Sequence, residues 1–245
     1  MLLHCFLICF VVVLVAAHGH AQSRTSSARA LHVAESDTLL SARLGPYYPH
    51  VDRELEATPF RDTFGSSHRV AAGFDFETLL WNVSDVGSVW FGVGAAYTRF
   101  SAKAPFTDGS GLSEQETYLA VLPIVAAVRL RGDVLVEHFA LPVAPYARGG
   151  FGNALWWTRT AAAGARERGG PRTLQGHSSG LYYAGGVLLL LDALDQAAAR
   201  TMAATSGVEH AYLGLELYAL DLGRFWPNEM RVGTRGWSVA LTLEM

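Results

Sequence analysis

The last twelve residues, 234–245, constrain the fold most, because their side chains alternate in character up to the end of the chain. One face of the segment carries Trp237, Val239, Leu241, Leu243 and Met245, and the other carries small or polar residues. A β-strand has a side-chain period of two, so the pattern predicts a strand with one apolar face. A strand at the end of a chain leaves an open edge unless another strand pairs with it. The segment therefore predicts a closed barrel in which the first strand pairs with the last.

The rest of the chain repeats this strand-length pattern between turn-rich breaks. In residues 69–80, Phe74 and Phe76 alternate with Asp75 and Glu77. Eight strands are predicted, and an even number returns both chain ends to the same side of a barrel. They are residues 39–45, 69–80, 88–100, 116–130, 144–157, 180–191, 211–220 and 234–245. The predicted fold is all-β: a single eight-stranded antiparallel up-and-down transmembrane β-barrel formed by residues 38–245.

The N-terminus has the pattern of a secretory signal peptide. An apolar run at residues 2–17 is followed by small residues before a cleavage position after Ala21. We therefore predict a signal peptide at residues 1–21 and a polar segment at residues 22–37. Both cysteines, Cys5 and Cys9, lie in the predicted signal peptide. The mature chain would have no thiol, which excludes disulfides, thiolate metal sites and cysteine nucleophiles.

Composition favours membrane-spanning strands over helices. Charged residues make up 17% of the chain, against roughly 25% in soluble domains. The mature chain offers no run of about 18 apolar residues, so no transmembrane helix is predicted. A net charge of −3 gives no basic surface for nucleic acid. The histidines show no metal-like spacing, so neither a metal nor another cofactor is expected. The partners expected are outer-membrane lipids and the barrel-assembly machinery, with the barrel itself a monomer.

The connections between strands differ in length at the two ends of the predicted barrel. Long external loops are expected near residues 46–68, 101–115, 159–179 and 221–232. The connections at the other end are residues 81–87, 131–143 and 192–210. The last of these carries alanine, leucine and methionine at helical spacing, which predicts a short amphipathic helix at the membrane surface.

Several short motifs follow one another along nearly all of the mature chain. They are Leu44–Pro49, Val51–Asp52, Phe64–Gly65, Gly73–Asp75, Val143–Gly152, Leu189–Asp195 and Gly207–Leu213. In these motifs the chain resembles a small, largely uncharacterised family of outer-membrane β-barrel proteins from Gram-negative bacteria. The resemblance implies a barrel in the outer membrane and carries no catalytic residues. This chain ends in Met245, where the family ends in an aromatic residue.

Charged residues on the inward face of the predicted strands form the first candidate site. An eight-stranded barrel is just wide enough for side chains to fill its interior. Charges in so narrow a lumen must pair or stay hydrated. The alternation predicts a polar lumen network, which would be a structural plug or, alternatively, a path for protons or small ions. The network comprises Arg43, Arg69, Asp75, Glu77, Arg148, Glu216 and Glu244.

The second candidate site is catalytic and lies at the outer end of a strand. His177 and Ser179 share one face of an extended segment, and a carboxylate such as Glu167 could complete a lipid-deacylating site. A serine becomes a nucleophile only when a base accepts its proton and a third group orients that base. The alternative interpretation is an ordinary polar loop rich in serine and glycine.

Two classes of function follow from these patterns. The first is an integral outer-membrane β-barrel with a side-chain-filled lumen and a non-enzymatic structural or surface-interaction role. The alternative is an outer-membrane lipid hydrolase that uses His177 and Ser179. Periodicity alone leaves a third possibility open, a soluble lipocalin-like barrel, because alternation does not distinguish the inside of a barrel from the outside.

Overall fold

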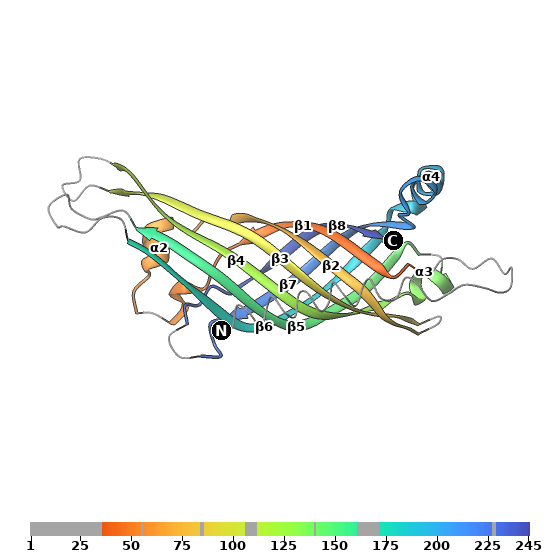
Figure 1. Ribbon diagram of the computed structural model, residues 1–245, viewed down its shortest axis with the longest axis horizontal. Helices are drawn as coiled ribbons and strands as arrows, with labels where there is room; N and C mark the ends of the chain where they lie inside the picture. The colour runs from red at the N-terminus through yellow and green to blue at the C-terminus, as the bar shows by residue number, and fades with distance from the viewer. Residues whose placement is uncertain are drawn as a thin grey trace, which may run out of the picture. The chain divides into compact units, whose positions relative to one another are not determined.

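The computed structural model describes residues 36–54, 56–83, 86–105, 112–139, 141–160, 172–226 and 229–245. The predicted signal peptide and nearly all of the predicted polar segment lie outside these residues. Within them, eight strands form one closed antiparallel barrel in sequence order (Figure 1). The strands are β1 (Thr38–Tyr47), β2 (Arg69–Val83), β3 (Gly87–Pro105), β4 (Leu112–Gly132), β5 (Val143–Thr160), β6 (Arg172–Leu190), β7 (His210–Leu222) and β8 (Thr234–Glu244).

The predicted closure of the barrel by its first and last strands is confirmed. Leu39 pairs with Glu244 and Leu44 pairs with Val239 in an antiparallel ladder. Inside the barrel, the hydroxyls of Ser41 and Thr242 hydrogen-bond across this seam at 2.8 Å. The single-sided apolar pattern of residues 234–245 thus corresponds to a strand that is paired on both edges.

Most strands are longer than the sequence predicts, and the excess is uneven around the barrel. β3, β4, β5 and β6 have 19, 21, 18 and 19 residues, whereas β1 and β8 have 10 and 11. We call the end of the barrel that holds the β1–β2, β3–β4, β5–β6 and β7–β8 connections the outer rim, and the opposite end the inner rim. The polar segments 101–105, 112–115 and 172–179 were predicted as loops. They instead belong to β3, β4 and β6, which lengthens these strands at the outer rim (Figure 1).

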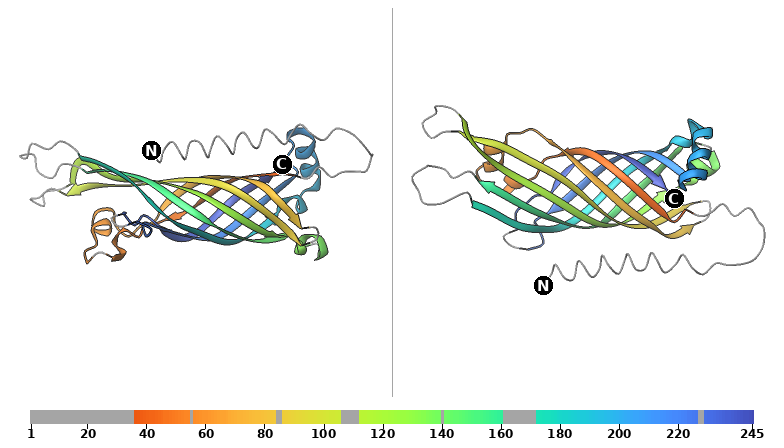
Figure 2. Two further views of the ribbon diagram at one scale, coloured as in Figure 1. Left: turned by 60° about the horizontal axis from the view of Figure 1, so that its bottom comes forward. Right: turned by 45° about the horizontal axis from the view of Figure 1, so that its top comes forward.

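At the inner rim, the predicted helix between residues 192 and 210 is confirmed as α4 (Gln196–Ser206), next to the short turn η2 (Leu191–Ala193) (Figure 2). The Asp195 side chain accepts hydrogen bonds from the backbone N–H groups of Ala197 and Ala198, a standard N-cap. Gly207 ends the helix in the left-handed conformation. A second inner-rim helix, α3 (Val134–Phe139), was missed by the sequence analysis, as six residues give little helical periodicity.

At the outer rim, the β1–β2 connection folds back over the barrel mouth. It contains the turn η1 (Val51–Glu54) and the helix α2 (Pro59–Phe64), neither of which was predicted. The Asp52 carboxylate accepts hydrogen bonds from the backbone N–H groups of Phe60 and Arg61 at 2.8 and 2.9 Å, which fixes the start of α2. The ring of Phe60 then packs edge-on against Phe100 at 5.1 Å between centroids.

The two faces of the wall differ sharply in polarity. Large apolar side chains cover the outside, for example Phe74, Leu215 and Leu241, which are 73%, 52% and 47% exposed. Charged side chains such as Asp75 and Glu216 alternate with them and are buried inside. None of the described helices has the length and hydropathy needed to span a membrane.

Candidate functional site in the lumen

A layer of three arginines and three carboxylates fills the middle of the lumen. Arg148 on β5 is its centre: its Nη2 lies 3.0 Å from Asp75 Oδ1 and 3.2 Å from Glu77 Oε1, and its Nη1 lies 3.3 Å from Glu216 Oε2. Arg129 Nη2 lies 2.8 Å from Glu77 Oε1. Arg43, Asp75, Glu77, Arg129, Arg148 and Glu216 make up what we call the charged layer.

Most of the remaining acceptor atoms of the charged layer contact arginine or tyrosine, but Glu77 Oε2 has no hydrogen-bond partner among the described residues. Arg43 Nε lies 3.3 Å from Asp75 Oδ2. The hydroxyls of Tyr146 and Tyr182 each donate to Glu216, both at 3.1 Å. Formal charges therefore balance within the layer. Buried ions in such a setting stabilise each other only when geometry and hydrogen bonding are good.

Glycines on β3 make room for the buried carboxylates. Gly94 is the register partner of Asp75, and Gly92 is the partner of Glu77. A Cβ atom on Gly94 would lie 2.0 Å from Asp75 Oδ1, and one on Gly92 would lie 2.3 Å from Glu77 Cγ. The two glycines therefore allow both carboxylates to lie flat against β3 and reach Arg148.

A separate ion cluster closes the inner rim. Arg131 makes a two-pronged contact with Glu244, with Nη1 2.7 Å from Oε2 and Nη2 3.3 Å from Oε1. Its Nε lies 2.8 Å from Asp133 Oδ1. Tyr212 donates its hydroxyl to Glu244 Oε2 at 2.8 Å, and Arg131 lies over the Trp90 ring. This cluster joins β4 to β8 across the lumen.

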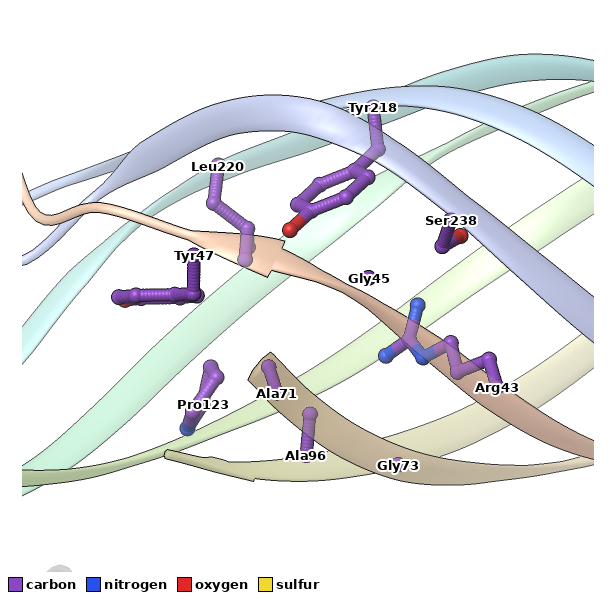
Figure 3. Close-up of a pocket in the computed structure, with 10 residues that line it drawn as sticks. All are labelled: Arg43, Gly45, Tyr47, Ala71, Gly73, Ala96, Pro123, Tyr218, Leu220 and Ser238. Carbon is purple, nitrogen blue, oxygen red and sulfur yellow. The ribbon is translucent and has the colours of Figure 1, made fainter. Parts of the chain in front are cut away.

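Toward the outer rim, the lumen is filled by what we call the apolar layer. Its members are Tyr47, Phe60, Phe100, Leu119, Val121, Val125, Leu220, Leu222 and Val232. A cavity of about 20 Å³ lies where this layer meets the charged layer. Figure 3 shows Arg43 at one end of the cavity and Tyr47 at the other. Such a space is about the size of one water molecule, so the two layers together leave little free volume.

Of the seven residues predicted for the lumen network, the structure brings five together. Arg43, Asp75, Glu77, Arg148 and Glu216 belong to the charged layer. Glu244 lies apart from them in the inner-rim cluster. Arg69 has the inward parity of β2, but it begins the strand at the outer rim and is exposed. Among the ion pairs of the described residues, none involves Arg69.

The sequence analysis missed two arginines. Arg129 and Arg131 lie on the inward face of β4, alternating with Val128 and Leu130. The part of β4 before Arg129 is apolar on both faces. The sequence therefore offered no polar face from which to decide which β4 side chains point inward. The paired glycines opposite Asp75 and Glu77 were also available as a signal, because small residues opposite carboxylates mark where a buried charge has space.

The proposed catalytic residues lie in a different setting from the one predicted. β6 begins at Arg172 rather than Gly180, so His177 and Ser179 are within the strand, paired with Leu155 and Asn153. Ser179 Oγ accepts a hydrogen bond from Asn153 Nδ2 at 2.8 Å. Glu167 lies outside the described residues.

A different carboxylate reaches the same place. Glu229, in the β7–β8 connection, accepts a hydrogen bond from the Ser179 N–H at 3.1 Å, and its Oε1 lies 3.9 Å from His177 Nε2. No hydrogen bond joins the His177 ring to the Ser179 hydroxyl among the contacts of the described residues. His177, Ser179 and Glu229 thus share one part of the outer face without forming a hydrogen-bonded triad.

Across the described part of the chain, no group of His, Cys, Asp and Glu has the arrangement of a metal site. No protein-family model and no curated protein matches the chain.

Several solved structures are similar in fold. Neisserial surface protein A is 12% identical with a TM-score of 0.45, over 85% of this chain and 96% of that one. Ail of Yersinia pestis, solved with a heparin analogue, is 7% identical with a TM-score of 0.41, over 85% and 96%. The outer membrane enzyme PagL is 11% identical with a TM-score of 0.39, over 84% and 99%. At these levels of similarity, no residue role is transferred to this chain.

Proposed function

We propose that this chain is an integral outer-membrane protein whose barrel is a closed, non-conducting anchor that carries its outer-rim elements beyond the membrane. In this role the barrel has no catalytic activity. The observation that carries the proposal is the inversion of polarity across the wall. Apolar side chains cover the outside, and the ion pairs are inside. In water this arrangement would expose a large apolar surface, whereas in a bilayer the same surface is solvated by lipid.

The filled lumen supports the non-conducting part of the proposal. The charged layer joins β1, β2, β4, β5 and β7 across the interior, and the apolar layer closes the lumen above it. A porin-like channel needs a continuous aqueous path, which neither layer offers. The signal-peptide pattern and the resemblance of the motifs to small outer-membrane barrels support the same location.

The decisive experiment is a charge placed on the outer face. Leu215 points outward near the middle of β7, so Leu215→Arg should destabilise a membrane-embedded barrel by about 2–4 kcal/mol. Leu194→Arg, at an exposed position beyond the end of β6, is the matched control and should cost at most about 1 kcal/mol. Unfolding in lipid vesicles by urea, followed by tryptophan fluorescence, measures both.

A soluble barrel would give the opposite result. Leu215→Arg would then be neutral or would improve solubility, and the wild-type chain would fold in buffer without detergent. Heat-modifiable gel mobility of the membrane fraction gives a second readout. Loss of that mobility shift in detergent extracts would exclude the membrane barrel.

A second candidate function, hydrolysis of a lipid ester at the outer face, is favoured by the position of Glu229 beside His177 and Ser179. For this chemistry the imidazole would take the Ser179 proton, and the hydroxyl oxygen would attack the ester carbonyl. The C–O bond of the ester would break, the alcohol would leave with the proton from the imidazolium, and water would then release the fatty acid from Ser179. Asn153 already donates to the Ser179 oxygen, so the hydroxyl proton is free to be donated.

Lipid mass spectra test the hydrolase directly. Cells that express the wild-type chain should contain deacylated lipid, and Ser179→Ala should abolish the deacylated species. Ser101→Ala, an exposed outward serine on β3, is the control that should leave it unchanged. Identical spectra from wild type, Ser179→Ala and cells without the protein would remove this candidate.

A further inference from the structure

Near the outer rim, the outward side chains of several strands change from apolar or aromatic to polar. On β3, outward Tyr97 is followed by outward Arg99. The same change separates Phe151 from Asn153, Leu181 from Ser179, Ala219 from Asp221, and Trp237 from Arg235. In the membrane location proposed above, this change marks the boundary between the hydrocarbon and the headgroups of the outer leaflet.

Beside this boundary, β3, β4 and β5 carry a cluster of aromatic and charged side chains on the outer face of the wall (Figure 1). The Arg99 guanidinium lies over the ring of Tyr118, with Cζ 4.4 Å from the ring centroid. The rings of Tyr97 and Trp157 lie 6.2 Å apart, with their planes inclined by 30°. Ala120 is the register partner of both Arg99 and Trp157, and it is fully buried although it points outward. We call Tyr97, Arg99, Tyr118 and Trp157 the outer-face cluster.

The charge around the outer-face cluster is positive. Arg99 Nη2 lies 3.9 Å from Glu116 Oε2, and both side chains are about half exposed. An ion pair of this length at an exposed site contributes little. Lys103 is the register partner of Glu116, and Arg159 is the partner of Tyr118. Among the described side chains on this part of the face, three cations thus accompany one carboxylate.

The geometry of Arg99 suits an anion with several oxygens. Stacking on the Tyr118 ring fixes the plane of the guanidinium and leaves the N–H groups at its edge available. No hydrogen bond to another described residue takes up these N–H groups. A guanidinium binds phosphate through two parallel hydrogen bonds, which is stronger and more directional than the contact of an ammonium group.

The wall next to the cluster indicates that the anion is part of a lipid. From Tyr118 toward the inner rim, every outward residue of β4 is apolar: Ala120, Leu122, Ile124, Ala126, Val128 and Leu130. Val128 and Leu130 are exposed on this surface. A ligand that contacts both regions has an anionic headgroup and acyl chains, whereas a soluble anion would contact only the cluster.

We propose that the outer-face cluster binds one outer-leaflet lipid with an anionic phosphate headgroup. The proposal rests on the membrane location proposed above. The Arg99 guanidinium binds the phosphate, and the acyl chains lie along the apolar outer face of β4. Tyr97 and Trp157 contact the lipid where its headgroup meets its chains, the depth that amphipathic aromatic side chains favour. Glu116 opposes binding, because it repels the phosphate and competes for Arg99.

The test uses the full chain in detergent micelles that contain equal amounts of phosphatidylglycerol and phosphatidylcholine. Native mass spectrometry counts the lipids that remain bound. The wild-type chain should retain one phosphatidylglycerol with about tenfold preference, and Arg99→Gln should remove this preference. Arg69→Gln, at an exposed outer-rim arginine with inward parity, is the matched control and should keep it. Unchanged heat-modifiable mobility would show that both variants fold.

A second variant separates lipid binding from a purely structural ion pair. In the proposed site, Glu116→Gln removes a competitor for Arg99 and should increase retention of phosphatidylglycerol. If Arg99 served only to pair with Glu116, Arg99→Gln and Glu116→Gln would change stability equally and leave lipid retention as it is. That result would overturn the proposal.

Inorganic phosphate distinguishes a lipid from a soluble anion. Millimolar phosphate should not displace the bound phosphatidylglycerol, because it gains nothing from the apolar wall. Displacement would overturn the assignment to a lipid, as would equal retention of the two lipids by the wild-type chain. If the Leu215→Arg test excludes the membrane while the Arg99-dependent preference persists, the proposed location fails and the site stands. If Leu215→Arg behaves as a membrane barrel requires and no preference appears, only the site fails.

Discussion

The charged layer and the apolar layer fill the same barrel by different means. The charged layer is held by ion pairs that radiate from Arg148, and each member has partners on several strands. The apolar layer is held by aromatic and aliphatic packing, part of which comes from α2 rather than the wall. The stability of the charged layer depends on the presence of every ion-pair partner. The stability of the apolar layer depends on how completely side chains fill the space. The two layers should therefore respond differently to substitution.

Loss of the central arginine should have the largest effect. Arg148→Met leaves Asp75, Glu77 and Glu216 with too few cations, and breaking a buried ion pair in this way costs about 3–5 kcal/mol. Urea unfolding in lipid vesicles measures the loss. Arg224→Met, which removes a half-exposed ion pair with Asp221, should change stability by at most about 1 kcal/mol. A small effect at Arg148 would mean that Arg43 and Arg129 alone neutralise the carboxylates.

Truncation in the apolar layer should cost slightly less. Phe100 is fully buried and contacts the rings of Phe60 and Phe64, so Phe100→Ala should lose about 3 kcal/mol. It should also release α2, which faster proteolysis of the β1–β2 connection would reveal. Phe151→Ala, on the outer face of β5, is the control and should leave proteolysis unchanged. Equal proteolysis of both variants would show that Phe100 does not hold α2.

A methyl group added beside the charged layer should have an intermediate effect. Gly94→Ala would push the Asp75 carboxylate away from Arg148, at a cost of about 1–3 kcal/mol. Gly149→Ala is the matched control, since its Cβ atom would meet nothing within 4 Å. If the two variants are equally stable, the tight fit of Asp75 against β3 does not contribute to stability.

Acid should lower the stability of the folded protein slightly through His50 at the outer rim. This is the smallest effect expected. The His50 N–H donates to the Gly233 carbonyl at 2.9 Å. Burial, with help from Arg53 and Arg235, lowers the pKa of His50 below its usual value of about 6.5. A histidine whose pKa falls on folding contributes no penalty above the unfolded pKa, and stability decreases as the pH drops through and below that value. The melting temperature should therefore fall less between pH 8 and pH 5 for His50→Gln than for wild type. Parallel slopes would contradict this assignment.

The sequence predicted the barrel because alternation is a direct consequence of a wall with two different faces. Strand number and closure follow from that pattern. Parity also places Arg43, Asp75, Glu77, Arg148 and Glu216 on the polar face of the wall, but it does not say whether that face is inside or outside. Strand ends were harder, because polar residues such as those at 172–179 form a sheet outside a membrane as readily as a loop. Local polarity does not distinguish these two outcomes.

The candidate sites were predictable only where a strand had one clearly polar face. Arg129 and Arg131 were missed because the preceding part of β4 is apolar on both sides. Glu229 was not associated with His177, since it comes from a connection whose path depends on tertiary contacts. Fifty residues separate Ser179 from Glu229, and no spacing rule relates them.

The β1–β8 seam also bears on how the chain reaches its final state. Leu39 meets Glu244, so the ladder that completes the wall joins the two extremes of the sequence. Until the C-terminal strand arrives, β1 and β7 are open edges and Arg131 lacks its Glu244 partner. Contacts between such distant residues carry a high loop-closure cost and make folding slow. A chain that lacks only its last strand would thus expose two unpaired edges, which makes it prone to aggregate.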